Sequence, residues 1–595
     1  MPGIGGALDI ARWSLYSSQL AIEVLSHNIA NANTPGYSRQ QLKIESNVPI
    51  TMGPGQIGTG VKATEVTRYY DAFINEQVTI KKSQYYYWDA QNRAMEEIET
   101  IFNESDEYGL NKIMGEFWNA WSDLSNNPEG SPEREALLAK SNNLIQFIGN
   151  LDYNLREYQR HLDSSIRGSV NQINGLIKQI ADLNNQISSV EINGIINAND
   201  LRDRRELLLE NLAEYLDISY YEEESSGQVM VYILGGTPLV LGKDHYALDY
   251  QRNAATGFTD ILWKDLSGRT INLTNKLEGG KIAGWANVRD TKIGSYLDSM
   301  NSLTKELVWQ VNALHSEGVG LDPVSSLTGT VEITDPTDDL GADFFFSDRF
   351  VSGGQFEIVA YDADGEVSNI YVIDPTGDTV GDLITEINTE AGAGGGEFTA
   401  SLNAAGFFTI QANGSHTFAI KHSSGAESSN ALAVMGVNTF FSWIEESGVP
   451  NDDVFDITQT LGINAELMAD SSRIAAGYLD GNGRVAPGMN NVALAVYSVQ
   501  DQVISNLGGT GLDTTLDAYF SSFIAEVGVD AQNASLNKKY NETLLDQYIQ
   551  RKESVTGVNL DEEMADILKY QHLYQAAAKL ISVCDEMMQT LLSVK

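Results

Sequence analysis

Residues 26–40 read SHNIANANTPGYSRQ, and this stretch decides how the chain folds at its start. The Asn-rich run and the Pro35-Gly36 pair form turns readily and end the preceding segment. Upstream, apolar residues recur every seven positions, which predicts a helix with one apolar stripe. The stripe consists of Leu8, Leu15, Ile22 and Ile29, with Ala11, Ser18, Leu25 and Ala32 beside it.

The C-terminal segment has the same periodicity. Its seven-residue stripe consists of Leu560, Ile567, Tyr574, Ile581 and Met588, flanked by Met564, Ala578 and Leu592. Asn559 is a suitable N-cap, and the acids that follow it favour the positive end of a helix. We expect the two terminal stripes to pair as a coiled coil, so that residues 1–60 and 545–595 form one terminal domain.

Between the ends the sequence predicts an α+β multidomain protein. We expect a mainly helical middle domain from residues 61–322 and 441–544, with a small β subdomain at about 217–280. The expected helical ranges are 70–125, 144–190 as one long helix or a helical hairpin, 199–216, 281–317, and about 454 to the end.

Residues 323–440 differ sharply in composition from the rest of the chain. They contain only two basic residues, Arg349 and Lys421, against 17 acids and 15 glycines. Short β-rich runs alternate with Gly, Asp and Asn, which is typical of strands and turns. We interpret this range as an inserted, acidic, β-rich outer domain.

Composition limits the classes of function. The 595 residues carry a formal charge of -43, which disfavours nucleic-acid binding because phosphate contacts need Lys and Arg. The single cysteine, Cys584, rules out an intramolecular disulfide and is expected to be buried on an apolar helical stripe. We see no apolar run long enough to cross a membrane and no Sec-type signal, so composition alone suggests a cytoplasmic protein.

Both terminal motifs resemble those of one protein family. The N-terminal run, with Asn28, Asn31, Asn33, Thr34, Pro35, Gly36 and Tyr37, resembles the signature of flagellar rod, hook and hook-associated proteins. The run SVTGVNLDEE at 554–563, with Gly557, Asn559, Leu560, Asp561, Glu562 and Glu563, resembles the C-terminal signature of the same family, in its hook-associated form. Residues 199–206, 311–318 and 379–402 resemble interior segments of that family.

The resemblance implies a structural subunit at the junction of hook and filament, and no enzyme. It implies self-assembly into a ring, with hook protein on one side and the third hook-associated protein, then flagellin, on the other. It further implies an export chaperone, export by the flagellar type III pathway, and an extracellular place on the flagellum. We expect neither nucleic-acid binding nor membrane insertion. The expected assembly interface consists of Leu8, Leu15, Ile22, Ile29, Leu560, Ile567, Tyr574, Ile581 and Met588.

Alternatives remain open at this point. The chain could be another axial protein, hook or distal rod, although the long helical run at 144–190 argues against hook protein. The insert could instead be a cell-wall hydrolase or a surface-binding domain on an axial scaffold. The sequence has no Walker-type loop, HExxH or CxxC motif, so we expect no catalytic, cofactor-binding or metal-binding residues. We expect His315 to cap or hydrogen-bond locally, and Asp480 to begin a turn.

Overall fold

The computed structural model describes residues 3–593 except 53–54, 104–108, 192–195, 224, 234, 266, 376, 378, 424–426, 446–455, 487, 510 and 512. The chain divides into two compact units. Unit 1 combines residues 1–95, 160–291 and 531–595, and unit 2 combines residues 96–159 and 292–530. Each unit is therefore assembled from segments that are far apart in the sequence.

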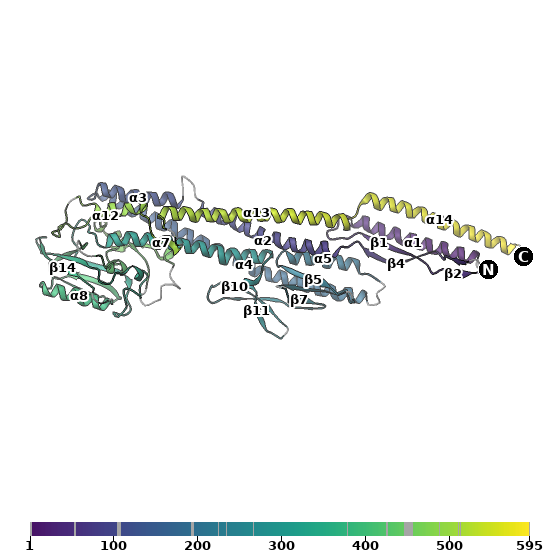
Figure 1. Ribbon diagram of the computed structural model, residues 1–595, viewed down its shortest axis with the longest axis horizontal. Coiled ribbons are helices and arrows are strands. Elements are labelled where there is room, and N and C mark those ends of the chain that lie inside the picture. Colours follow the sequence, from purple (N-terminus) through teal and green to yellow (C-terminus); the bar gives the residue numbers. More distant parts are fainter. Residues whose placement is uncertain are drawn as a thin grey trace. The chain divides into compact units, whose positions relative to one another are not determined.

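In unit 1 the two ends of the chain lie together. The N-terminal helix α1 (Ile4–Asn31) packs against the C-terminal helix α14 (Leu560–Ser593). Asn28, near the end of α1, contacts Glu563, near the start of α14, so the helices run antiparallel. Figure 1 accordingly shows both chain termini at the same end of this pair. The predicted pairing of the two ends is present.

A β-ribbon lies along the other side of α1. The strands β1 (Gln40–Ser46) and β4 (Val61–Arg68) pair antiparallel, with a register shift between Lys43 and Ile44. The chain between them forms a second small hairpin, β2 (Ile50–Met52) and β3 (Gly55–Ile57). Thus α1 contacts α14 and the ribbon at once.

The main core of unit 1 joins helices to small antiparallel sheets. Apolar residues of α4 (Ser131–Val190), repeated at helical spacing from Ile166 to Ala181, pack on α5 (Asn199–Ala213) and on the strands. The remaining elements are β5 (Ile218–Glu222), β6 (Val229–Ile233), β7 (Thr237–Leu241), β8 (Asp244–His245), β9 (Leu248–Arg252), β10 (Thr259–Lys264), β11 (Thr270–Asn272), the 3-10 turn η1 (Thr274–Lys276) and α6 (Gly280–Asn287).

Unit 2 has a helical part with an aromatic core. The helices are α3 (Leu110–Asn126), α7 (Ile293–Ser316) and α12 (Asn491–Ser498), and α12 contacts both others. Phe117 and Trp121 of α3 pack against Phe440, with ring centroids 6.4 and 5.1 Å away. The helices α2 (Ala72–Phe102), α4 and α13 (Leu516–Thr556) contribute residues to both units.

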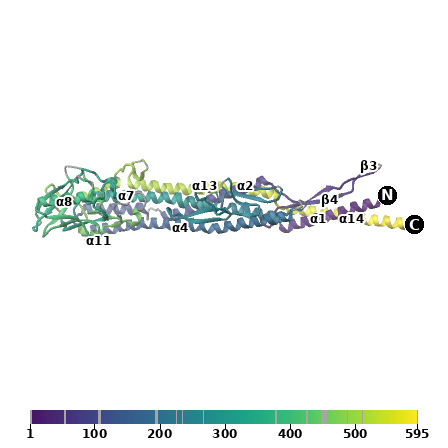
Figure 2. The same ribbon diagram turned by 90° about the horizontal axis from the view of Figure 1, so that it is seen from below.

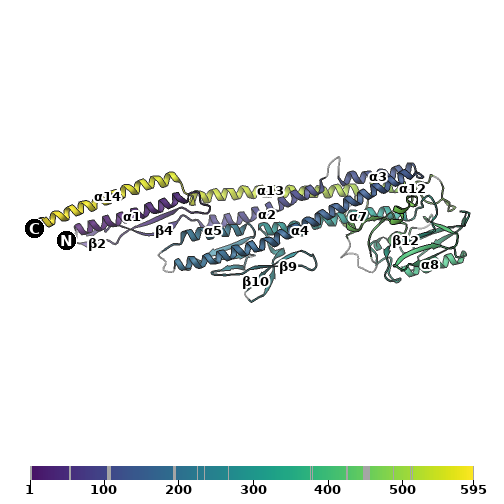
Figure 3. The same ribbon diagram turned by 180° about the vertical axis from the view of Figure 1, so that it is seen from behind.

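The β-rich part of unit 2 contains two three-stranded antiparallel sheets. Their strand orders are β12-β16-β15 and β14-β13-β17. Helix α8 contacts β14 and β15. Figure 1 shows α8 next to β14, and Figure 3 shows it from behind, near β12. The bounds are β12 (Ser326–Glu332), β13 (Phe356–Tyr361), β14 (Val367–Ile373), α8 (Val380–Ala393), β15 (Phe398–Leu402), β16 (Phe407–Ala412) and β17 (Thr417–Lys421).

The other elements of unit 2 are short. They are η3 (Ser347–Arg349), α9 (Ala431–Val434), β18 (Phe441–Ser442), α10 (Ile457–Thr460), β19 (Gly462–Ile463), α11 (Ala465–Ala469), η4 (Ser471–Arg473), η5 (Val499–Asp501) and η6 (Leu507–Gly509). The described residues between 457 and 515 thus form short helices and one short strand joined by loops. The expectation of continuous helix from about 454 was wrong, because glycines at positive φ, among them Gly483 and Gly508, interrupt this range.

Several sequence expectations are met. The fold is α+β, and the 144–190 run lies in one continuous helix, α4. The expected 281–317 helix is divided by a π-helical turn, η2 (Val288–Lys292), between α6 and α7. In the β-rich part, Thr379 caps α8 by accepting a hydrogen bond from the backbone N–H of Asp382, as a short helix before a hairpin requires. The three-part domain division stays a prediction.

Candidate functional site: the paired terminal helices

Helices α1 and α14 pack along a seam, and most of the side chains that they bury are small. On α1 the buried residues are Ala11, Ser17, Ser18, Ala21, Leu25 and Asn28. On α14 only Glu563, Ala577 and Cys584 are buried. Small residues let two helices approach closely, so the seam is narrow. Cys584 is buried, as the sequence predicted, and behaves as a small apolar residue.

The predicted stripe residues lie beside this seam. Leu8, Leu15, Ile22 and Ile29 of α1 are half-buried, as are Ile567 and Ile581 of α14. Leu560, Tyr574 and Met588 are exposed. The heptad period is therefore correct for helix formation, but the residues beside the predicted stripe make the seam. Whether the predicted residues form an assembly interface stays a prediction.

Helix α14 exposes a broad apolar surface beside the seam and on its far face. With 100° between successive residues, Leu573 and Leu580 lie next to the buried Ala577, and Leu568 lies on the opposite face of the helix. The exposed large apolar residues are Leu560, Met564, Leu568, Leu573, Tyr574, Leu580, Val583, Met587, Met588, Leu591 and Leu592. Monomeric proteins rarely expose contiguous apolar patches of more than a few hundred Å², so this surface is suited to contact with protein.

Asn28 is the centre of a buried polar network that joins the two terminal motifs. Its side-chain amide donates to the carboxylate of Glu563, at 2.8 Å, and to the backbone carbonyl of Gln40, at 2.9 Å. Its side-chain oxygen accepts from the Tyr37 hydroxyl, at 2.7 Å, and from the Gln40 backbone N–H, at 2.9 Å. Asn28 and Glu563 are both 0% exposed. We call Asn28, Tyr37, Arg39, Gln40 and Glu563 the terminal hub.

Charge neutralisation of the hub comes from Arg39. Its guanidinium lies 2.6 Å from one carboxylate oxygen of Glu563 and 3.1 Å from Glu562. Burial alone would lower the pKa of Arg39, but the Glu563 carboxylate outweighs it and raises that pKa. The backbone N–H of Arg39 donates to the carbonyl of Thr556, at 2.8 Å. Arg39 therefore holds the start of α14 with its side chain and the end of α13 (Leu516–Thr556) with its backbone.

The hub continues onto α5. The backbone N–H of Ser38 donates to the carboxylate of Asp203, at 2.9 Å. Arg68 of β4 binds Asp203 and Glu206 at 2.7 and 2.8 Å. Burial raises the pKa of Glu206, although Arg68 opposes the shift. Burial, with Asp200, Asp203 and Glu563 nearby, also raises the pKa of the Tyr37 hydroxyl, which stays protonated and donates to Asn28.

The turn after α1 explains several motif residues. Thr34 donates its hydroxyl to the side-chain oxygen of Asn31, at 3.2 Å. Gly36 adopts φ +75°, and a Cβ there would lie 3.3 Å from Leu207, so a larger residue would be strained and crowded. Asn33 and Pro35 are exposed.

The C-terminal motif supplies the start of α14. Asn559 caps the helix by accepting from the backbone N–H of Asp561, at 3.0 Å, as predicted. A Cβ at Gly557 would lie 2.4 Å from the carbonyl oxygen of Glu553, so this position has no room for a side chain. Asp561 is exposed, while Glu562 and Glu563 both reach Arg39.

Sequence reasoning missed the partners that connect the motifs. Arg39 and Gln40 stand inside the quoted N-terminal run, and Asp203 inside the quoted 199–206 run, but none was assigned a role. The available signal was that Arg39 and Asp203 are charged residues within runs that both resemble the same family. The sequence pattern does not show that these distant runs lie close together in the fold.

Other candidate sites are structural. His315 is fully buried; one ring nitrogen faces the carbonyl of Asn438, at 2.8 Å, and the other accepts from the N–H of Ala475, at 2.9 Å. The expectation of local bonding was wrong, because both partners lie more than a hundred residues away in sequence. Asp480 begins a turn as predicted, accepting from the N–H groups of Asn482 and Arg484.

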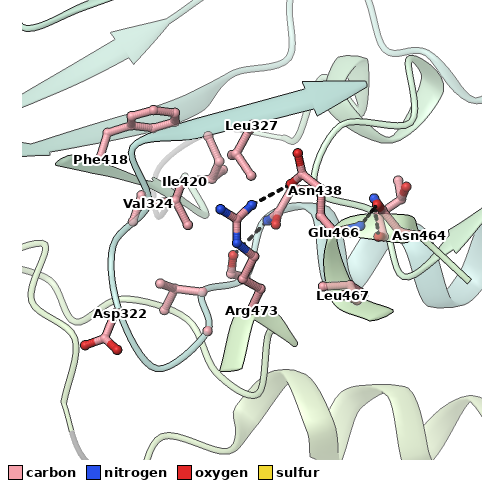
Figure 4. Close-up of a pocket in the computed structure, with 15 residues that line it drawn as sticks. Asp322, Val324, Leu327, Phe418, Ile420, Asn438, Asn464, Glu466, Leu467 and Arg473 are labelled. Carbon is pink, nitrogen blue, oxygen red and sulfur yellow. Dashed lines mark hydrogen bonds and ion pairs between the residues drawn. The ribbon is translucent and has the colours of Figure 1, made fainter. Parts of the chain in front are cut away.

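A small pocket in unit 2 has no room for a substrate. Its volume is about 20 Å³, enough for a water molecule. Figure 4 shows Arg473 among apolar side chains, and it donates to Glu466 at 2.7 Å. Burial raises the pKa of Glu466, opposed by Arg473. The ion pair satisfies two polar groups in this pocket.

The described ranges offer neither a metal site nor a membrane-spanning helix. They contain no group of three or more His, Cys, Asp or Glu residues placed to hold a metal ion. Among the helices built from those residues, none combines the length and apolar character that a membrane span needs.

Comparison with known proteins matches the two regions joined by the hub. The profile of the flagella basal body rod protein matches residues 12–37. The profile of the flagellar basal body rod FlgEFG protein C-terminal matches residues 551–594. The profile of the flagellar hook-associated protein FlgK helical domain matches residues 95–329. The chain thus belongs to the axial proteins of the bacterial flagellum.

Within that class the chain is similar from end to end to flagellar hook-associated protein 1. It is 24% identical to that protein of Bacillus subtilis (strain 168), over 98% of this chain and 97% of the relative. Identity to the Salmonella typhimurium protein is 25%, over 99% of both chains. The flagellar hook junction protein FlgK from Burkholderia pseudomallei shares the fold, with a TM-score of 0.51 at 15% identity, covering 81% of this chain and 100% of that one.

Proposed function

We propose that this protein is a structural subunit of the hook–filament junction, which assembles with copies of itself through its paired terminal helices. The observation that carries the proposal is the apolar surface of α14 that stays exposed beside the α1 seam. A surface of this kind gains free energy only when another chain covers it. The full-length similarity to hook-associated proteins supports the junction as the place of assembly.

The terminal hub gives the surface a defined position. Asn28 and Glu563 tie α14 to α1. Ser38, after the turn, and Arg68, at the end of β4, both bind Asp203 of α5. The pair is therefore fixed to the rest of unit 1 through buried polar contacts. In the ring, each copy would present α14 in the same orientation to its neighbours, as closed symmetric assembly requires.

Partners and export follow from the resemblance of both termini to axial proteins. Hook protein would contact one side of the ring, and the third hook-associated protein, followed by flagellin, the other. An export chaperone would cover the apolar terminal helices before assembly, and the flagellar type III pathway would deliver the chain to the cell exterior. In this role the protein is not an enzyme.

The alternatives are less well supported. The hook-associated helical profile at residues 95–329 favours this class over hook and distal rod proteins. A hydrolase would need paired carboxyl groups of unlike pKa at an open cleft. In the β-rich part, burial would raise the pKa of Glu397, but bonds from Ser368, Tyr371 and Asn369 lower it overall. This buried carboxylate is thus engaged in structure.

The test is complementation in a motile bacterium whose own gene has been deleted. Without the protein, cells should make hooks without filaments and lose filament subunits to the medium; the wild-type chain should restore filaments. The variant Leu580→Asp puts a charge on the exposed surface of α14, and Gln571→Asp is a matched control at an exposed polar position of the same helix. Filaments with Leu580→Asp, or hooks and filaments without the chain, would refute the proposal.

A further inference from the structure

The small hairpin beyond the β1–β4 ribbon is uncharged and exposed. Residues 46–61 contain no Asp, Glu, Lys or Arg, in a chain whose formal charge is -43. Val48, Ile50 and Ile57 are 77%, 52% and 47% exposed. We call the described residues 46–52 and 55–61 the hairpin arm. Its composition is typical of a surface that contacts protein.

Two of the exposed apolar residues share one face of the arm. Ile50 and Ile57 are directly opposite each other in the β2–β3 pairing, so their side chains point to the same side. Val48, in the segment that leads into β2, is a third exposed apolar residue of the arm. A two-stranded hairpin alone is marginally stable in water, and an apolar face that remains wet makes it less so.

The arm is anchored at its base. At the base, a Cβ on Gly60 would lie 3.3 Å from the Cα of Ile10, and the N–H of Asn47 donates to the carbonyl of Gly60 at 2.8 Å. Beyond this contact the β3 end of the ribbon stands apart from α1 (Figure 2). The apolar face is thus held out from its own chain.

We propose that the hairpin arm docks on a second copy of this chain, on the exposed apolar surface of that copy's α14. This inference rests on the proposed function and adds the partner surface. The distribution of charge indicates which surface the arm binds. Two copies with this net charge repel each other, so they can approach only through surfaces without acidic residues. Between Asp566 and Asp585, α14 has no acidic residue; its basic residues there are Lys569, His572 and Lys579.

The apolar residues of the arm are few enough to lie within the row that α14 exposes. Val48 and Ile50 are two residues apart, about 7 Å at 3.3 Å per residue, and Ile57 is paired opposite Ile50. On α14 the step from Leu573 to Met587, with Leu580 between them, is about 21 Å at 1.5 Å per residue. All three α14 residues are exposed and recur every seven positions, so they lie along one side of the helix. The uncharged arm therefore matches part of this row in chemistry.

Photo-cross-linking in flagellated cells tests the proposal with the full-length protein. A photoreactive amino acid at Val48 should give a product of twice the 65.1 kDa chain mass, with the cross-link mapped to 573–587 of the second copy. The same amino acid at Val372, 46% exposed on β14, should give no link to that segment. A Val48 product only with another protein, only within one chain, or with another surface of the copy would overturn the proposal.

Charge variants separate docking from folding. Ile57→Glu should reduce the Val48 cross-link at least tenfold, while Gln56→Glu, on the opposite face of the same hairpin, should leave it unchanged. Equal loss in both variants, or loss in neither, would overturn the proposal. Immunolabelling of hook tips distinguishes failure of the docking proposal from failure of the proposed function. Protein at the junction without the Val48 cross-link would refute only the docking of the hairpin arm. Absence of the protein from the junction would refute the proposed function as well.

Discussion

The terminal helix pair of unit 1 and the β-rich part of unit 2 use apolar residues in opposite ways. In the β-rich part, Phe356, Phe398 and Phe418 are fully buried within the chain. On α14 only Ala577 and Cys584 are buried apolar residues, and leucines and methionines of similar size stay exposed. The β-rich part buries its large apolar residues within one chain, whereas α14 keeps its large apolar residues exposed, where another chain can cover them.

This difference predicts where mutations act. A change in the β-rich part should alter the stability of the free subunit, because its core is complete in one chain. A change on the exposed apolar surface of α14 should leave the stability of the free subunit unchanged and should weaken assembly. The following predictions test that separation in order of expected effect on stability.

The largest loss should follow Phe418→Ala in β17. Phe418 is fully buried, and its ring centroid lies 6.0 Å from that of Phe398. Removing a buried Phe side chain costs about 3–5 kcal/mol in free energy of unfolding. Urea denaturation of the secreted subunit, followed by tryptophan fluorescence, measures this loss; Leu580→Ala on α14 is the matched control and should be nearly neutral. Similar losses of unfolding free energy in Phe418→Ala and Leu580→Ala would contradict the proposed difference between the two regions.

Acid should weaken unit 2 through His315. Burial lowers the pKa of His315 to about 4, and its ring is packed against Trp121 and Phe440. Since the unfolded chain binds the proton near pH 6.5, stability is complete above that pH and falls as pH drops toward 4. The total loss is about 3 kcal/mol.

The check is unfolding free energy measured from pH 7 to 4. The variant His315→Gln should lose this part of the pH dependence while the carboxylates continue to titrate. The groups that face the ring are the carbonyl of Asn438 and the N–H of Ala475, with Arg134 near enough to lower the pKa further. Identical pH profiles for wild type and variant would show that His315 does not titrate in this range.

A smaller, local loss should follow Asn28→Ala. The change leaves Glu563 and the Tyr37 hydroxyl without their partner in a buried site, at a cost of about 2 kcal/mol. Hydrogen exchange should accelerate in α1 and α14 and stay unchanged in the β-rich part. The control Asn33→Ala, at an exposed position of the same turn, should change nothing measurable; faster exchange across both regions would contradict a local role for the hub.

The smallest effect on stability should come from Leu573→Ser on α14, within about 0.5 kcal/mol, because the residue is exposed in the free subunit. Assembly should nevertheless weaken, because the same residue would be covered by a neighbouring copy. Secreted monomer and filament number, counted together, measure the two effects. Reduced thermal stability with normal filaments would reverse the expected pattern.

Much of this arrangement was predictable from the sequence. The heptad periods fixed both terminal helices, and the Pro35-Gly36 turn and the Asn559 cap fixed their ends. Periodicity could not show that Ala11 and Ala577 are buried while Tyr574 stays exposed. An apolar stripe has the same period whether it packs within the chain or against another.

The long-range contacts were also beyond the sequence. Asn28 and Glu563 are separated by 535 residues, and each is polar, so a pattern of burial gave no reason to place them together. His315 likewise binds two loops that follow it at large separation. Such contacts depend on where several elements converge, which local propensity does not specify.

The most direct test of the central claim is the accessibility of position 580 before and after assembly. In a Cys584→Ala background, Leu580→Cys provides one thiol on the exposed apolar surface of α14. We predict rapid maleimide labelling in the secreted subunit and strong protection in isolated hooks that carry the assembled junction. Equal labelling in the two states would contradict the account, because α14 would then stay exposed in the ring.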